Sequence, residues 1–283
     1  MKLSVLATKL EPMLRIMQCP VCASPFLCDG QSLRCTQNHC FDLSAKGYVN
    51  LAPSHVQSKE KYDQALFESR RQVFEDGFYT PVVSCIHSML QNRFADQSFS
   101  LLDVGCGEGY YARELSKQLP NTKILGVDLS RDAIMAAART ASTANFLVAN
   151  LKQLPIASSS IDLVLDVLTP ADYTEFRRVL SPDGELIKVV PGNEYLKEVR
   201  EAVSGHLRND SYDNSQVVSH LEAQMQIIER KVIHHTMPLS PVQAKHFLKM
   251  TPMTFSISDE ELALHSPAAI TIHMEVLRCR AKS

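Results

Sequence analysis

The sequence predicts an α/β protein with a doubly wound, Rossmann-like sheet, preceded by a small metal-binding module. From Ser98 onward, short apolar runs alternate with amphipathic stretches of about ten residues, as in parallel strands joined by helices. A glycine-rich string, from Leu102 to Gly109, stands where the first of these strands gives way to a helix. Five cysteines, from Cys19 to Cys40, predict the module.

Length and charge narrow the class of protein. The chain has 283 residues, of which 45% are hydrophobic, enough for one large domain or two smaller ones. Its formal net charge of -2 argues against a protein that coats nucleic acid, although a local basic patch would suffice to bind RNA. No apolar run reaches the roughly 18 residues of a membrane span. Lys9 and Arg15 interrupt the start too soon for a signal peptide. We therefore expect a cytoplasmic protein whose residues 1–18 are a short amphipathic segment or a flexible tail.

The expected elements follow the chain in order. Two helices, 65–75 and 81–92, precede the sheet and are joined by a turn at Gly77. Strands are expected at 101–104, 123–127, 146–149, 161–167 and 185–190, with helices at 110–119, 131–141, 171–180 and 195–207. Two more strands, 226–234 and 269–277, flank a helix at 241–250. The expected division is a module at 1–53, a linker with helices at 54–97 and a main domain at 98–283.

The cysteine cluster has the spacing of a zinc site. Cys19 and Cys22 form one close pair, and Cys35 forms another with His39, which gives C-x2-C-x12-C-x3-H. Zinc takes thiolate and imidazole ligands and fills all four positions in structural sites. Cys40 adjoins His39 and is the alternative fourth ligand, but His39 keeps the more regular spacing. A module this small buries too little to fold alone, so zinc should supply much of its stability.

The glycine string predicts the binding of a nucleoside cofactor. Gly105, Gly107 and Gly109 let the backbone turn tightly, and Asp103 precedes the first of them by two positions. Asp128 closes the second strand, where an acid can accept hydrogen bonds from both ribose hydroxyls. The G-x-G-x-G spacing differs from the usual pyrophosphate loop. S-Adenosylmethionine carries no phosphate, and its ammonium group can pair with Asp103. A nicotinamide cofactor, or a glycine turn without a ligand, stays open as an alternative.

These motifs resemble a known family. The string from Asp103 to Tyr111 resembles motif I of class I methyltransferases, which use S-adenosylmethionine. Asp128 with Leu129 resembles the acidic motif that follows it, and Asn150 with Leu151 stands where such enzymes contact the adenine. The wider sequence resembles the RlmA family of 23S ribosomal RNA guanine-N1 methyltransferases. The stretches that carry this resemblance are Cys19–His39, Phe41–Leu51, Arg70–Tyr79 and Asp103–Tyr111.

The resemblance implies a class I methyltransferase domain behind a zinc module. It also implies methylation of guanine N1 in a domain II hairpin of 23S rRNA. Residues 166–170 and 175–181 are more similar to the Gram-positive branch, which is linked to macrolide resistance. Within the family, Tyr79, Glu108 and Gly109 correspond to cofactor contacts. A histidine contact of the family falls at Tyr195 here, and a tyrosine hydroxyl can still donate a hydrogen bond.

The chemistry adds a proton acceptor and an RNA surface. Guanine N1 must lose its proton to take a methyl group. Asp166, at the end of the fourth strand, is the candidate acceptor, because a carboxylate can accept both N1–H and N2–H. RNA contacts are expected from basic and aromatic residues that precede the sheet. These are Lys46, Tyr48, Lys59, Lys61, Arg70 and Arg71. A homodimer stays open.

Two other functions share some of these features. A methyltransferase of a small molecule would have the same motif I, but the zinc module and the positive N-terminal part favour a macromolecular substrate. A non-catalytic zinc- and RNA-binding protein is disfavoured because Asp103 and Asp128 are intact. Cofactor titration separates the second alternative from the favoured function. Label transfer to RNA, compared with small-molecule extracts, separates the first.

Overall fold

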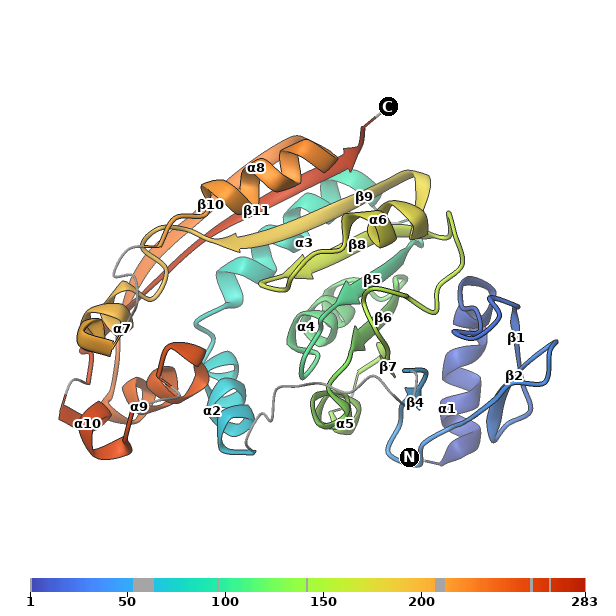
Figure 1. The fold of residues 1–283 in the computed structure, drawn as a ribbon, viewed down its shortest axis with the longest axis horizontal. Coiled ribbons are helices and arrows are strands. Elements are labelled where there is room, and N and C mark those ends of the chain that lie inside the picture. Colours follow the sequence, from blue (N-terminus) through green and yellow to red (C-terminus); the bar gives the residue numbers. More distant parts are fainter. Residues whose placement is uncertain are drawn as a thin grey trace.

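The protein is built on one large sheet (Figure 1). The computed structural model describes residues 2–52, 64–95, 97–140, 142–206, 212–254, 257–264 and 266–282. The sheet has eight strands in the order β10-β11-β9-β8-β5-β6-β7-β4. Their bounds are β4 Val49–Asn50, β5 Ser100–Val104, β6 Lys123–Asp128, β7 Asn145–Val148, β8 Ile161–Val167, β9 Leu180–Pro191, β10 Met225–Pro238 and β11 Ala269–Ala281. Strands β5 to β9 are parallel, and β11 and β10 add an antiparallel pair. The predicted doubly wound α/β class is confirmed.

Helices cover both faces of this sheet. Helices α3 (Thr80–Phe94), α4 (Tyr110–Gln118) and α5 (Arg131–Arg139) pack on one face, and α6 (Tyr173–Val179) and α8 (Ser215–Gln224) pack on the other. Successive strand residues point to opposite faces. In β5, Leu101 therefore belongs to the first core and Leu102 to the second, and both are fully buried.

The N-terminal segment is part of the second core. Helix α1 (Leu3–Leu10) is followed by the 3-10 helix η1 (Glu11–Ile16), and both pack against the sheet. Leu6 and Leu10 are at most 1% exposed, so residues 1–18 contain an amphipathic helix and the flexible tail is not observed. A three-stranded sheet lies beside α1, formed by β1 (Phe26–Cys28), β2 (Ser32–Cys35) and β3 (Cys40–Asp42) (Figure 1).

Strand β4 joins the N-terminal residues to the main sheet. It pairs in parallel with β7, through Val49 opposite Leu147 and Asn50 opposite Val148. The expected boundary at residue 53 lies outside the described residues, and the three-part division of the chain stays a prediction.

The remaining elements mostly follow the sequence. The two early helices are α2 (Gln64–Glu75) and α3, and the late helix is α9 (Pro241–Met250). The helix expected at 195–207 is wrong in extent. Its described part contains α7 (Lys197–Ala202) and a 3-10 turn, η2 (Ser204–His206). Leu196 has a left-handed φ of 52°, so the helix begins only at Lys197, and Val203, with a φ of -120° and a ψ of 20°, ends it. The 3-10 turn η3 (Pro252–Thr254) and α10 (Asp259–Leu264) were not expected. Among the described residues, no helix is long and apolar enough to cross a membrane.

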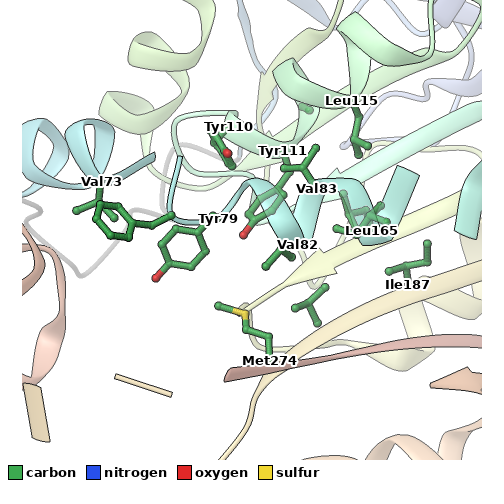
Figure 2. Close-up of a cluster of buried hydrophobic side chains, with 14 of the residues drawn as sticks. Val73, Tyr79, Val82, Val83, Tyr110, Tyr111, Leu115, Leu165, Ile187 and Met274 are labelled. Atoms are coloured by element: carbon green, nitrogen blue, oxygen red, sulfur yellow. The ribbon is translucent and has the colours of Figure 1, made fainter. Parts of the chain in front are cut away.

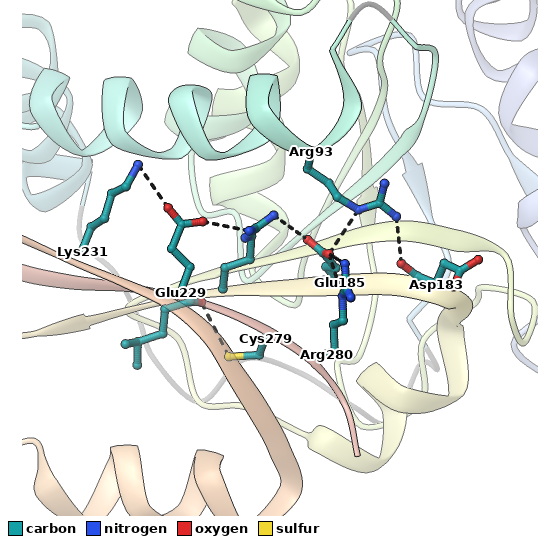
Figure 3. A network of polar contacts seen from close by, with 9 residues as sticks. Arg93, Asp183, Glu185, Glu229, Lys231, Cys279 and Arg280 are labelled. Carbon is teal, nitrogen blue, oxygen red and sulfur yellow. Dashed lines mark hydrogen bonds and ion pairs between the residues drawn. The ribbon is translucent and has the colours of Figure 1, made fainter. Parts of the chain in front are cut away.

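A buried carboxylate ties three elements together at the amino-terminal end of β9 (Figure 3). Glu185 is completely buried, and its Oε1 accepts hydrogen bonds from Arg93 Nε at 3.1 Å and Arg280 Nη2 at 2.9 Å. Arg278 Nη1 lies 3.5 Å from the second carboxylate oxygen. Arg93 comes from α3, and the other two arginines come from β11, so one acid holds a helix and a neighbouring strand against β9.

Replacement of this acid should destabilise the fold. Glu185→Gln leaves three guanidinium groups around a neutral amide, and we expect a loss of about 2–3 kcal/mol in the free energy of unfolding. The value lies below that of a fully buried pair because Arg280 is 53% exposed. Urea denaturation of the variant measures it. Glu114→Gln, which removes a partly exposed partner of Lys117, is the control and should change stability by less than about 0.5 kcal/mol. Equal losses in the two variants would contradict the prediction.

Candidate functional site

A cavity of about 980 Å³ opens at the carboxyl ends of the parallel strands. This is the edge at which doubly wound sheets bind ligands. The loops after β5, β6, β8 and β9 form its floor, and α2 and α8 contribute to its walls. The predicted cofactor residues that line it are Tyr79, Asp103, Gly105, Gly107, Glu108, Asp128, Leu129, Leu151 and Tyr195. Gly109 and Asn150 do not line it, and their cofactor contacts stay predictions.

The glycine loop needs its glycines for two different reasons. Gly105 has a φ of 65°, and a Cβ there would lie 2.4 Å from Oγ1 of Thr169, so a side chain would collide with the neighbouring loop. Gly107 also has a positive φ, of 53°, but nothing lies within 4 Å of its Cβ position. The backbone at Gly107 is therefore open, and a ligand can approach it closely.

Asp128 holds the glycine loop in place. Its Oδ2 accepts a hydrogen bond from the Gly107 N–H at 2.9 Å, and its Oδ1 accepts one from the Ser130 N–H at 2.8 Å. Ser130 in turn is the N-cap of α5. One carboxylate therefore connects β6, the loop after β5 and the start of α5, and it retains lone pairs for a ribose. Burial raises the pKa of Asp128 above its ordinary value.

Two carboxyl groups at the cavity each have one oxygen without a hydrogen-bond partner among the described residues. Asp103 is 2% exposed, and its Oδ2 has no hydrogen-bond partner among the described residues. Glu108 Oε2 also has no hydrogen-bond partner among the described residues. Burial raises the pKa of Asp103 to about 8 and that of Glu108 to about 7, while Arg70 opposes the second shift. Carboxyl oxygens without a hydrogen-bond partner beside a cavity fit a ligand that carries positive charge and hydroxyl donors.

Aromatic side chains also line the cavity, and Figure 2 shows three of them, Tyr79, Tyr110 and Tyr111, beside the hydrophobic core. The hydroxyls of Tyr79 and Tyr195 are 2.6 Å apart, and burial raises the pKa of Tyr195 to about 12. Phe74 of α2 stacks on Tyr110 of α4 with ring centroids 4.2 Å apart. Tyr195 therefore stands at the cavity as expected, paired with the other tyrosine that the family resemblance singled out.

These features fit S-adenosylmethionine. Asp128 can hold the ribose hydroxyls, and Asp103 and Glu108 can face the positively charged part of the molecule. Leu129 and Leu151 offer apolar contacts near the ribose-binding acid. The cofactor supplies a methyl group on a sulfonium when it is bound.

Asp166 is not placed where the sequence suggested. Its side chain is 0% exposed, and Oδ2 accepts an ion-paired hydrogen bond from Lys188 Nζ at 2.8 Å. Lys188 lines the cavity and Asp166 does not. Direct contact between the Asp166 carboxylate and a base is therefore wrong, because the β8–β9 register sets the acid opposite Lys188. Lys188 was missed, although a lysine within the apolar run Leu186–Val190 is itself an unusual signal.

The candidate RNA residues have different surroundings. Lys46 is exposed, and Arg71 is exposed with Glu68 and Glu75 as ion-pair partners. Tyr48 is only 3% exposed, and its hydroxyl accepts a hydrogen bond from Arg131, so base stacking on its ring is wrong. Arg70 lines the cavity. Lys59 and Lys61 lie outside the described residues.

The four predicted metal ligands come together. The ligand atoms of Cys19, Cys22, Cys35 and His39 all lie within 4.8 Å of one another. Cys22 Sγ is 3.6 Å from Cys35 Sγ, which is 3.3 Å from Nδ1 of His39. Cys40 is exposed and is not in the group, so the choice of His39 is confirmed. Three thiolates and an imidazole are the donor set of a structural zinc site.

A second cluster of metal-ligating residue types lies where the loop after β9 meets the antiparallel pair β10 and β11. Glu194, His234 and His273 also have ligand atoms within 4.8 Å of one another. Here the groups already have partners. Lys197 Nζ lies 2.6 Å from Glu194 Oε2, and His273 Nδ1 accepts the Glu194 N–H at 3.2 Å. These contacts hold the loop that carries Tyr195.

The fold, the glycine loop with its acids and the cysteine cluster define a class I methyltransferase that uses S-adenosylmethionine and carries a structural zinc ribbon. Two family models match the chain: a methyltransferase domain over residues 101–184, and the RlmA N-terminal zinc ribbon over residues 17–61.

Curated relatives match along nearly the whole length. The Bacillus subtilis protein YxjB, described as a candidate 23S rRNA (guanine-N1)-methyltransferase, is 32% identical and the match covers 93% of this chain and 96% of YxjB. The 23S rRNA (guanine(748)-N1)-methyltransferase of Streptomyces fradiae is 26% identical over 88% of this chain and 89% of its own. A malonyl-[acyl-carrier protein] O-methyltransferase of Laribacter hongkongensis is 37% identical, but over only 37% of this chain and 41% of its own. The chain belongs to the RlmA family of 23S rRNA guanine-N1 methyltransferases.

The state of Asp103 predicts a pH dependence of cofactor binding. With a pKa of about 8, the free carboxyl is mostly protonated at pH 7, whereas a bound cation favours the carboxylate. Binding of S-adenosylmethionine should therefore release a proton, and this contribution to affinity should increase as the pH rises towards 8. Calorimetry at pH 7 in two buffers of different ionisation enthalpy counts the protons. Cofactor binding to Asp103→Asn should release fewer protons. An unchanged number of protons would contradict the assignment of Asp103 to the cationic part of the cofactor.

Proposed function

We propose that the protein methylates N1 of a guanine in 23S rRNA, with S-adenosylmethionine as the methyl donor. The observation that carries the proposal is that one chain contains both a cofactor cavity and a zinc ribbon. A cavity lined by acids that each have one oxygen without a partner lies at the carboxyl edge of the sheet, and a zinc ribbon of the RlmA type shares a hydrophobic core with that same sheet. Relatives that match along most of the chain have names that state guanine-N1 methylation of 23S rRNA.

The residues of the chain divide the work. Asp128 fixes the glycine loop and the ribose, and Asp103 faces the cationic part of the cofactor. Phe74 and Tyr110 stack on each other and line the cavity, and such apolar faces help to keep water away from the reacting groups. The target base must leave its helix or lie in a loop to enter a cavity of this depth.

The finer assignments belong to the same proposal. We infer that the guanine lies in a hairpin and that the substrate preference follows the Gram-positive branch, as the name of the Streptomyces fradiae relative supports. Lys46 and Arg71 are the described candidates for phosphate contacts. A cytoplasmic location and a homodimer are part of the proposal, and light scattering of the purified protein tests the latter.

Label transfer tests the function. Tritium from labelled S-adenosylmethionine should enter undermethylated 23S rRNA, and mass mapping should place it on N1 of one guanine. Asp128→Ala serves as the inactive control. A small-molecule methyltransferase is the competing function, since the match to a malonyl-[acyl-carrier protein] methyltransferase covers the catalytic part of the chain. Label in a metabolite or a carrier protein, with none in RNA, would falsify the proposal.

A further inference from the structure

Lys188 lines the cavity, and its ammonium group has a hydrogen-bond donor to spare. It lies in β9 opposite Asp166 of β8, and it is 4% exposed. Nζ donates to Asp166 Oδ2 at 2.8 Å and to the backbone oxygen of Thr169 at 2.5 Å. An ammonium group has three N–H donors. Within the described residues, these two acceptors leave one donor for whatever occupies the cavity that Lys188 lines.

This donor lies close to the cofactor loop. Thr169, whose carbonyl accepts from Lys188, packs its side chain directly on Gly105, where an added Cβ would be only 2.4 Å from it. A single residue therefore separates the ammonium group from the glycine loop. A substrate that reaches the methyl donor must pass through the same part of the cavity.

The neighbouring wall is apolar and exposed. Leu168, the residue before Thr169, is 42% exposed with a left-handed φ of 56°, and Val217 of α8 is 39% exposed. Both line the cavity. Large apolar side chains and unusual backbone conformations at a cavity are features of binding sites. Apolar faces beside a single cationic donor fit a flat heterocycle with an acceptor on its edge.

We propose that Lys188 donates a hydrogen bond to O6 of the target guanine, and that Asp166 positions Lys188 for this contact. The inference rests on the proposed function, since it assumes that guanine is the substrate. It makes Lys188 a catalytic residue, and it gives the buried acid a role through the lysine.

The contact favours the reaction at N1. Loss of the N1 proton places negative charge on N1 and O6, and a cationic donor at O6 stabilises this charge. The N1 proton passes to water. The N1–carbon bond then forms as the carbon–sulfur bond breaks, and sulfur keeps the electron pair. Loss of one such donor typically lowers the rate by about 100- to 1,000-fold.

The same contact selects the base. Adenine carries an amino group where guanine carries O6, so its N–H donors would face the ammonium group and neither would find an acceptor. Lys188 should therefore reject adenine and 2,6-diaminopurine, which also has an amino group at position 6. Inosine keeps O6 and lacks only the 2-amino group, so it should be accepted.

The test combines enzyme variants with altered RNA. Lys188→Met and the double variant Asp166→Asn/Lys188→Met are compared with Lys117→Met, a surface control that is 59% exposed. The double variant leaves no unpaired charge buried, so it keeps the test valid if the single variant does not fold. Three measurements are made: the affinity for S-adenosylmethionine, the pH profile of the methylation rate, and the affinity of cofactor-free protein for hairpins with guanine, inosine or 2,6-diaminopurine at the target.

The expected result has three parts. Both Lys188 variants bind the cofactor within about threefold of the wild type, but methylate about 100-fold more slowly, and the midpoint of their pH profile moves upward. The preference of the wild type for guanine over 2,6-diaminopurine falls by about tenfold or more in the variants. A purely structural role would scale the pH profile without moving its midpoint.

Several outcomes would overturn the inference. Cofactor affinity lost together with Lys188 would assign the ammonium group to the cofactor instead. An unchanged base preference and pH midpoint would exclude contact with O6. Failure of the wild-type protein to form N1-methylguanosine would refute the proposed function itself. If the wild type methylates guanine and the Lys188 variants do so equally well, only the role of Lys188 is refuted.

Discussion

Asp128→Ala should strongly weaken the affinity of the protein for S-adenosylmethionine. The carboxylate is expected to accept hydrogen bonds from the ribose, and it accepts those from the N–H groups of Gly107 and Ser130. Each bond to a charged group contributes about 1.5–3 kcal/mol, so loss of the ribose contacts and of the loop anchor should weaken binding by at least about 100-fold. Isothermal titration with S-adenosylhomocysteine measures the dissociation constant without turnover.

Two further variants sharpen this prediction. Asp128→Asn keeps the shape and one acceptor oxygen, and should lie between the wild type and the alanine variant. Asp132→Ala removes an exposed acid from the first turn of α5 and should leave affinity unchanged. An alanine variant at position 128 that binds within about fivefold of the wild type would contradict the assignment of this acid to the ribose.

Cys22→Ser should release zinc and unfold the ribbon. Metal binding supplies on the order of 10 kcal/mol of folding free energy in small zinc modules. The strands β1 to β3 are three or four residues long and cannot replace that contribution. No residue from 2–52 lines the cofactor cavity, so the affinity for S-adenosylhomocysteine should remain within about threefold. RNA methylation should fall, because the ribbon is expected to help bind the substrate.

The measurements are zinc content by atomic absorption, cofactor affinity by calorimetry and methyl transfer to RNA. Cys28→Ser is the matched control. Cys28 lies outside the ligand cluster, so this variant should keep its zinc. Loss of cofactor binding together with zinc would show that the ribbon and the sheet fold as one unit. Leu6 and Leu102 belong to the same hydrophobic core, so that outcome would contradict a domain boundary at residue 53.

The parallel strands β5 to β9 and the metal ligands could be predicted because each depends on local sequence. Alternating apolar runs define β5 to β9, and the acids at strand ends follow from the strands. The spacing of Cys19, Cys22, Cys35 and His39 contains the metal site in twenty-one residues (19 to 39), so little depends on distant parts of the chain.

The failures depend on partners far away in sequence. Tyr48 is buried because Arg131 and the core of the main domain cover it, which no local pattern shows. Asp166 is buried because the register of two parallel strands places it opposite Lys188. Helix α7 begins late because Leu196 takes a left-handed conformation and ends early because Val203 leaves helical geometry, and backbone propensity predicts neither.

Strand β4 and helix α1 have a consequence for how the chain acquires its structure. During translation, residues 2–50 emerge before their partners at Asn145–Val148 and Ile156 exist. Until about a hundred further residues have been made, the apolar side of α1 has no surface to cover it, and such delayed long-range pairing slows folding. We expect the amides of Val49 and Leu51 to gain protection from hydrogen exchange late in refolding, after those of the central strands.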